Sequence, residues 1–188
     1  DRPTGELTAE SMCQALGALL PEGAIVSDEG NTSGLFAPMY SAGSPEHDWL
    51  CLTGGAIGQG MPVATGAAVA SPGRKVINLE ADGSAMFTIQ SLWTQAREGL
   101  DVTTIIVNNS SYAVLNMELQ RVGAEAAGPK AQEMLDLSGP TPDFVSIAQG
   151  FGVPASRATT ADELVEQLEA GLAEDGPKVI EAIVPSIF

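Results

Sequence analysis

Two short apolar runs, each followed at once by polar residues, constrain the fold of this chain most strongly. Residues 75–79 precede Asp82, and residues 102–107 precede Asn109. Short, β-branched runs without polar alternation are typical of strands buried on both faces of a parallel sheet. The segment between them, residues 88–98, has helical spacing and is followed by a glycine. The sequence therefore predicts a strand–helix–strand unit.

The ends of these two strands predict a metal site. A right-handed crossover brings the carboxyl ends of both strands to the same edge of the sheet. The carboxylate of Asp82 and the side-chain oxygen of Asn109 then face a common crevice, and both are hard ligands that suit a cation of the size of magnesium. An Asp-Gly sequence by itself is most often a plain turn, so the prediction depends on both motifs standing one crossover apart.

The rest of the chain continues the alternation of strands and helices. Further strands are expected at residues 24–28, 49–53, 152–156 and 178–184. Further helices are expected at residues 7–20, 61–70, 112–122, 144–149 and 161–173. We therefore expect an α/β fold: a three-layer sandwich with a mostly parallel, doubly wound sheet of about six strands and helices on both faces.

Length and charge limit the domain organisation and the partners. The 188 residues suit one domain, which we place at residues 7–188, and we expect the polar residues 1–6 to be a linker remnant of a larger polypeptide. A net charge of −16 argues against nucleic acid and anionic membrane surfaces as partners. Cys13 and Cys51 have no zinc-site spacing, and we expect both to be buried thiols of a cytoplasmic protein.

The two motifs carry a resemblance to a known family. Asp82-Gly83-Ser84, with Asn109 placed 27 residues after Asp82, resembles the thiamine diphosphate signature of the acetolactate synthase, benzoylformate decarboxylase and pyruvate decarboxylase family. The resemblance covers nearly the whole chain and is closest to the pyrophosphate-binding domain of acetolactate synthase-like proteins. Ala81 stands where the family has a glycine. Because alanine adds only a methyl group and tolerates extended geometry, we expect the ligand position to survive.

The resemblance implies a set of binding residues. Magnesium would be bound by Asp82, by Asn109 and by the backbone carbonyl of Ser111, together with oxygens of the cofactor. The residues that the resemblance places against thiamine diphosphate are Asn31, Thr32, Gly55, Ile57, Gly83, Ser84, Tyr112 and Leu115. Gly83 and Ser84, at a helix N-terminus, would present backbone amides to the diphosphate.

The glycine-rich turn at residues 54–60 is the second implied site. In the family this turn lies beside the aminopyrimidine ring, so Ile57 would force the cofactor into a bent shape and the carbonyl of Gly55 would accept a hydrogen bond from the exocyclic amine. Glycine-rich turns between a strand and a helix occur in many nucleotide-binding folds. Without the downstream Asp82 and Asn109, this turn would be interpreted as a generic phosphate loop.

The resemblance also implies missing partners. In the family the activating glutamate belongs to a separate pyrimidine-binding domain, so we expect no catalytic residue in this chain and an incomplete site without that domain. The parent enzyme would decarboxylate or ligate a 2-oxo acid. Because the family binds its cofactor between subunits, we expect a homo-oligomer, with an apolar edge at Ile57, Met61, Tyr112 and Leu115.

Two alternatives remain open at this point. The glycine-rich turns are also compatible with a Rossmann-like nucleotide-binding module, although Val63 stands where the dinucleotide fingerprint that starts at Gly58 requires a glycine. The chain is also compatible with a non-catalytic subunit that keeps the fold for assembly. Ala81 and the missing pyrimidine-binding domain motivate that second alternative.

Overall fold

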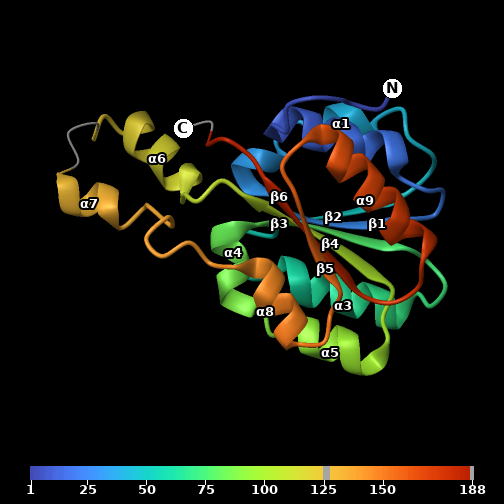
Figure 1. Ribbon diagram of the computed structural model, residues 1–188. Coiled ribbons are helices and arrows are strands. Elements are labelled where there is room, and N and C mark those ends of the chain that lie inside the picture. Colours follow the sequence, from blue (N-terminus) through green and yellow to red (C-terminus); the bar gives the residue numbers. More distant parts are fainter. Residues whose placement is uncertain (125–127, 187–188) are drawn as a thin grey trace.

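The computed structural model describes residues 1–124 and 128–186, and it contains one six-stranded sheet with helices on both faces (Figure 1). The strands are β1 Ile25–Glu29, β2 Asp48–Cys51, β3 Val76–Ala81, β4 Val102–Asn108, β5 Ala155–Ala158 and β6 Lys178–Ile183. They lie in the order β2-β1-β3-β4-β6-β5, and every neighbouring pair is parallel. The expected three-layer α/β fold is confirmed.

One predicted helix and one predicted strand have bounds that differ from the expectation. The helices are α1 Ala9–Leu19, α2 Ala37–Ser41, α3 Gly60–Ala70, α4 Asp82–Thr88, α5 Ser91–Glu98, α6 Ala113–Arg121, α7 Pro129–Glu133, α8 Phe144–Gly150 and α9 Ala161–Ala173, with a 3-10 turn, η1, at Asn31–Gly34. The single helix expected at 88–98 is two helices, because the first begins directly at Asp82. Strand β5 begins three residues later than expected, since Gly152 adopts a φ of 81° and Pro154 has no amide to donate.

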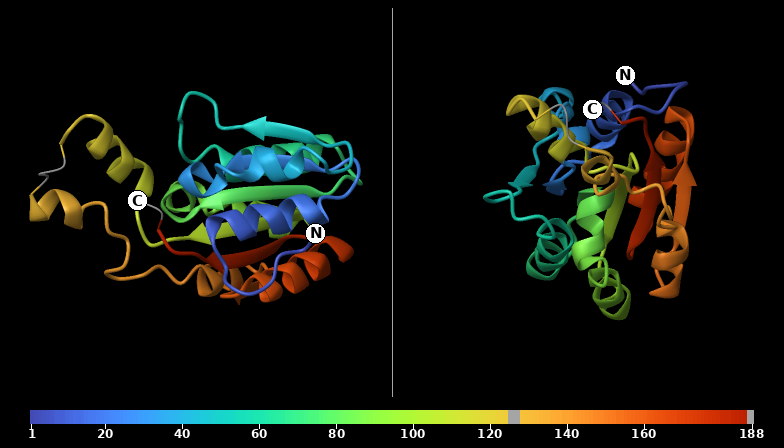
Figure 2. Two further views of the ribbon diagram at one scale, coloured as in Figure 1. Left: turned by 90° about the horizontal axis from the view of Figure 1, so that it is seen from above. Right: turned by 90° about the vertical axis from the view of Figure 1, so that its left-hand side faces the viewer.

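Two helical layers cover the two faces of the sheet (Figure 2). On one face α1 and α9 pack against alternate strand residues such as Val26, Ile77 and Ile105. On the other face α3, α5 and α8 pack against Ile25, Val76, Val102, Ile106 and Val179. Burying an aliphatic side chain of this size stabilises the fold by about 1.5–3 kcal/mol. Both helical layers therefore fix where the strand ends lie.

The face under α3 is interrupted by polar side chains. Ser27, Asn78 and Thr104 are in register across β1, β3 and β4, and all three are buried. Two residues further along, Glu29 of β1 pairs with Glu80 of β3, and both are buried as well. Because side chains two apart face the same side of a sheet, this polar band runs toward the carboxyl ends of the strands.

A helical arm extends beyond the carboxyl edge of the sheet. It contains α6 and α7, which project away from the layers in Figure 1. Residues 110–112 and 135–137 close its base: the amide of Tyr112 donates to the carbonyl of Leu135 at 2.9 Å, and the amide of Leu137 donates to the carbonyl of Ser110 at 2.9 Å. The arm therefore starts at the same loop that carries Asn109.

The N-terminal residues lie along α9. The amide of Gly5 donates to the Asp162 carboxylate at 2.7 Å, and the carbonyl of Gly5 accepts from the amide of Ala161 at 2.9 Å. Thr160 and Glu163 form a capping box at the start of α9, as the sequence predicts. Among the described residues, no helix has both the length and the apolar character needed to cross a membrane.

The two cysteines differ in environment. Cys13 on α1 is buried, and burial raises the pKa of its thiol to about 12. Cys51 ends the edge strand β2 and is exposed, so the expectation that it is buried was wrong. An edge strand has a neighbouring strand on one side only, and β2 lies at the edge of the sheet.

We therefore expect one of the two thiols to react in the folded protein. Only thiolates react rapidly with disulfide reagents, so Cys51 should react at pH 8 whereas Cys13 should react only after unfolding. Thiol titration with and without denaturant measures this difference. Cys51→Ser should abolish the reaction of the folded protein, and a folded Cys51→Ser variant that still reacts rapidly would contradict the prediction.

Candidate functional site

The carboxyl ends of β1, β3 and β4 meet at one edge of the sheet. The chain passes from β1 to β2 in one direction and returns past β1 to β3, so the winding of the sheet reverses between β1 and β3. Open α/β sheets bind ligands at such a reversal. Asp82 directly follows β3 and Asn109 directly follows β4, so the fold brings both predicted ligand positions to this edge.

Asp82 is buried, with an exposed fraction of 3%. One carboxylate oxygen accepts the amide of Gly83 at 2.8 Å, and the other accepts the amide of Ser110 at 2.7 Å. Burial raises the pKa of Asp82 to about 6, although the surrounding backbone amides oppose the shift. The carboxylate therefore sits in a pocket of backbone donors in which a cation would favour the ionised form.

The loop after β4, residues 109–111, lies against the carboxylate of Asp82. Ser110 adopts a φ of 54°, in the left-handed region that few non-glycine residues enter. The side-chain oxygen of Asn109 accepts the amide of Ser111 at 3.0 Å. The bridge at the base of the arm uses the carbonyl of Ser110 and the amide of Tyr112 rather than the carbonyl of Ser111. The three predicted metal positions thus lie within one loop and the adjacent strand end.

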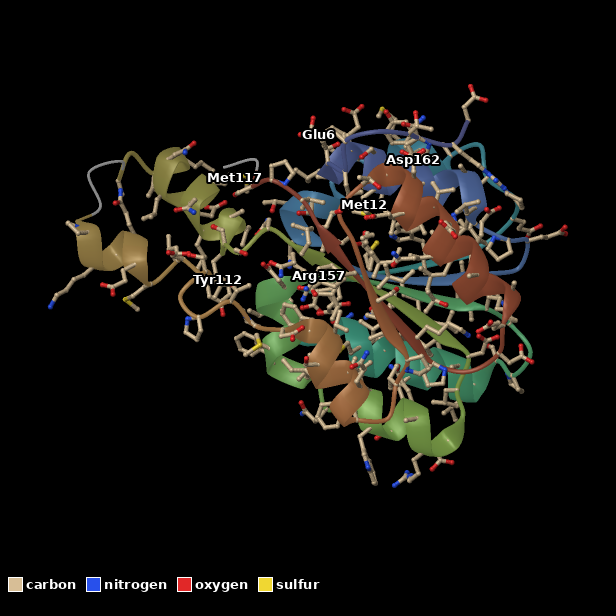
Figure 3. The ribbon with its side chains drawn as sticks, in the orientation of Figure 1. Glu6, Met12, Tyr112, Met117, Arg157 and Asp162 are labelled. Carbon is tan, nitrogen blue, oxygen red and sulfur yellow. The ribbon has the colours of Figure 1, made fainter. Side chains whose placement is uncertain are left out.

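A second hydrogen-bond network connects this loop to strands β5 and β6. Asn108 accepts the amide of Ser110 at 3.0 Å and donates through its amide nitrogen to the buried carboxylate of Glu181 at 2.7 Å. Arg157 donates to the other oxygen of Glu181 at 2.8 Å and pairs with Asp143 at 3.0 Å. Arg157 lies toward the carboxyl ends of the strands in Figure 3. Strands β5 and β6 therefore support the loop without contributing a predicted ligand.

Two predicted diphosphate residues are in direct contact. The side-chain amide of Asn31, at the start of η1, donates to the hydroxyl of Ser84 in α4 at 2.9 Å. Asn31 has a φ of 49°, a conformation that asparagine tolerates well. Thr32 follows it in η1 and is buried. The ends of β1 and β3 are thus joined by residues that the family resemblance places against the diphosphate.

Tyr112 and Gly83 are also in contact. A Cβ atom at Gly83 would overlap the ring of Tyr112, so only glycine permits this approach. Tyr112 lies between the arm and the strand ends in Figure 3. Ala81, the departure from the family signature, has extended geometry (φ −75°, ψ 146°), as expected for alanine there.

The glycine-rich turn lies beside the carboxyl end of β1, where Glu29 accepts two of its amides. Gly54, Gly55 and Gly58 have φ values of 64°, 69° and 92°, which a residue with a side chain adopts only with strain. Ile57 is 38% exposed. The carbonyl of Gly55 accepts the amide of Ile57 at 3.0 Å, and a carbonyl oxygen has a second lone pair for another donor.

One member of the expected apolar edge is not exposed. Met61 is fully buried under the sheet, so its inclusion in an exposed patch was wrong. It packs in the core with Ala85 and Ile106, because α3 turns this position toward the strands. Leu115 is exposed, as expected, on the first turn of α6 in the arm.

Sequence reasoning missed two acidic residues at this site. Glu29 and Glu80 end or nearly end their strands, are 1% and 0% exposed, and lie under the glycine-rich turn. Burial, and then the proximity of Glu29, raise the pKa of Glu80 to about 9. The signal was present in the sequence, because a glutamate inside a strand buried on both faces requires a specific partner.

The donor set fits a magnesium ion. The described residues contain no cluster of three or more acidic, histidine or cysteine side chains that would bind a metal alone. Asp82, Asn109 and a carbonyl offer a partial set of oxygen ligands. Magnesium characteristically takes one or two carboxylates and completes its coordination with water and phosphate.

Comparison with known proteins agrees with this geometry. Residues 28–182 match the family model for the thiamine pyrophosphate enzyme, C-terminal TPP binding domain. A Mycobacterium tuberculosis protein with the name "Putative acetolactate synthase large subunit IlvX" is 60% identical over 98% of this chain, which spans 36% of that protein. Benzoylformate decarboxylase of Pseudomonas aeruginosa is 33% identical over 97% of this chain, which spans 33% of it.

A solved structure has the same fold. The thiamine diphosphate-dependent 4-hydroxybenzoylformate decarboxylase of Rhodococcus jostii superposes with a TM-score of 0.82 and 29% identity, over 96% of this chain and 33% of that one. The chain thus spans about a third of the length of these relatives. Because the family model covers most of its residues, the chain belongs to the thiamine pyrophosphate enzymes and corresponds to their C-terminal TPP binding domain.

Proposed function

We propose that this chain binds the diphosphate and the magnesium ion of thiamine diphosphate, as the C-terminal domain of an acetolactate synthase-like 2-oxo acid decarboxylase or carboligase. The observation that carries the proposal is that the 109–111 loop lies against the buried carboxylate of Asp82 and donates a backbone amide to it. The family membership and the relatives named as acetolactate synthase and benzoylformate decarboxylase support it.

The residues of this chain would divide the binding task. Asp82 and Asn109 would supply side-chain oxygens to magnesium, and Ser111 would supply its carbonyl. The hydroxyl of Ser84 and the amide group of Asn31, already in contact, would turn toward the diphosphate oxygens together with Thr32. Tyr112 would close the site from the side of the arm, because its ring already lies against Gly83.

The glycine-rich turn would orient the other end of the cofactor. Thiamine diphosphate, when bound, supplies a thiazolium carbon that attacks the carbonyl group of a 2-oxo acid. Ile57 would support both rings from below, and the second lone pair of the Gly55 carbonyl would accept a hydrogen bond from the pyrimidine amine. Leu115, at the base of the arm, would cover the thiazolium side.

The proposed site is incomplete in this chain. The resemblance places the activating glutamate on a pyrimidine-binding domain of the same or a partner polypeptide, and the chain spans about a third of its relatives. We therefore propose that the chain by itself is inactive. We also propose that the complete enzyme works in the cytoplasm. The choice of 2-oxo acid would rest largely on side chains outside this domain.

Magnesium-dependent cofactor binding tests the proposal. Calorimetric titration with thiamine diphosphate should give binding in the presence of magnesium that EDTA abolishes. Asp82→Ala should weaken that binding by at least on the order of 10- to 100-fold, the loss that outer-shell substitutions already cause at metal sites. Asp175→Ala is the matched control, because this side chain is 98% exposed and lies at the opposite edge of the sheet.

Three results would contradict the proposal. Binding that is the same with magnesium and with EDTA would remove the metal assignment. An Asp82→Ala variant with unchanged affinity would do so as well. If manganese, a spectroscopic substitute for magnesium, and thiamine diphosphate both fail to bind the folded protein, the whole proposal is wrong.

We further propose that the chain forms a homodimer through the exposed apolar side chains near the site. Ile57 and Leu115 are 38% and 46% exposed, and burying them in an interface is favourable. The net charge of −16 opposes association most strongly at low salt, where screening is weak. Sedimentation velocity over a salt series should therefore show a dimer that strengthens with salt, and a monomer at every salt concentration would contradict this.

A further inference from the structure

Helix α3 has no cap of its own. Its first residue is Gly60, and the preceding residue, Gln59, makes no capping hydrogen bond with its side chain. That side chain instead bonds the backbone of Thr53 and of Cys51, both at 3.2 Å. The first amides of a helix need other acceptors, because no earlier turn supplies carbonyls.

The acceptor comes from a different strand. One oxygen of Glu29 accepts the amide of Gly58 at 2.5 Å, and the other accepts the amide of Gly60. Glu29 ends β1 and is 1% exposed. Its carboxylate therefore binds two amides at the positive end of an eleven-residue helix, where an anion is most favourable.

This position is the one that a phosphate group occupies in nucleotide-binding glycine-rich loops. Here an anion of the protein itself fills it. A second anion at the same amides would meet the charge of Glu29 and would lack free donors. The turn at 54–60 consequently differs from a phosphate loop, and the donors left for a diphosphate are those beside Asp82 and Asn31.

The same contact explains why residue 60 is glycine. A Cβ atom there would overlap the carboxyl group of Glu80 and would lie 2.8 Å from the Cβ atom of Glu29. Glu80 is in turn held by the side-chain amide of Asn78 at 3.1 Å. The two buried glutamates thus pack directly against the backbone of the turn.

We propose that Glu29 is a positioning residue: its carboxylate fixes the turn 54–60, and so places Ile57 and the carbonyl of Gly55 for the cofactor. This rests on the proposed function, because Ile57 and Gly55 have a role only if thiamine diphosphate binds. Glu29 contacts no reacting atom. It acts through the two amides that it holds.

Glu29→Gln tests the proposal with little change in shape. The glutamine carbonyl still accepts one amide, but its NH2 group faces the other donor. In the cofactor-free protein, ¹⁵N-glycine labelling should show the amide proton signal of Gly58 or Gly60 moved upfield, with hydrogen exchange faster by about ten-fold or more. Affinity for thiamine diphosphate with magnesium should fall by about ten-fold.

Two further variants keep the test decisive. Glu22→Gln, at an exposed glutamate, should leave both glycine signals and the affinity unchanged. Glu29→Asp keeps the charge but shortens the side chain by one methylene, so it should retain part of the affinity that Glu29→Gln loses. A purely structural role would lower the free energy of unfolding of Glu29→Gln without changing the dissociation constant of the folded protein.

The results separate this inference from the function on which it rests. Unchanged glycine signals in folded Glu29→Gln overturn the assignment, whatever the cofactor does. Changed signals with unchanged affinity also overturn it, because the turn would then not position the cofactor. If Glu29→Gln does not fold, Glu29→Asp is measured by the same criteria. A wild-type protein that binds no cofactor refutes the proposed function, while the glycine signals still test the contact.

Discussion

The structure depends on the hydrogen-bond donors and cations that offset the cost of burying carboxyl groups at one edge of a parallel sheet. Glu29, Glu80, Asp82 and Glu181 all lie there with exposed fractions of 3% or less. An unpaired charge in such a place would cost several kcal/mol, so each group must find donors or become neutral. Each of the four has a different solution, and these differences separate structural acids from the candidate ligand.

Three of the four acids are compensated within the chain. Glu29 is bound by two amides at the start of α3, and Glu181 by Arg157 and Asn108. Glu80 accepts the side-chain amide of Asn78 and lies beside the carboxylate of Glu29, and burial raises its pKa to about 9, which makes it neutral near pH 7. Asp82 also accepts backbone amides, yet burial still raises its pKa to about 6, so its charge, mostly ionised near pH 7, is not fully compensated within the chain. It is therefore the acid at this edge whose charge calls for a cation.

The sequence predicted the fold and the Asp82–Asn109 convergence because both depend on local patterns. A β-branched run marks a buried strand, and the crossover rule places its end. It did not predict the role of Glu29, because that contact depends on the register of β1 with β3 and on the path of a turn that lies 29 residues further along the chain. Cys51 and Met61 were misplaced for a related reason: exposure at an edge strand or on a helix face is decided by tertiary packing.

The charge of the chain limits how a diphosphate can be held. Of its eight lysines and arginines, seven form ion pairs with acidic side chains of the described residues. Arg157, toward the strand ends, is bound to Glu181 and Asp143. A diphosphate at this edge would therefore have to be neutralised by a divalent cation, with backbone amides and the polar groups of Asn31 and Ser84 as donors. The acidic composition disfavours an anionic ligand by itself. Binding of a diphosphate at this edge would therefore depend on a metal ion at Asp82.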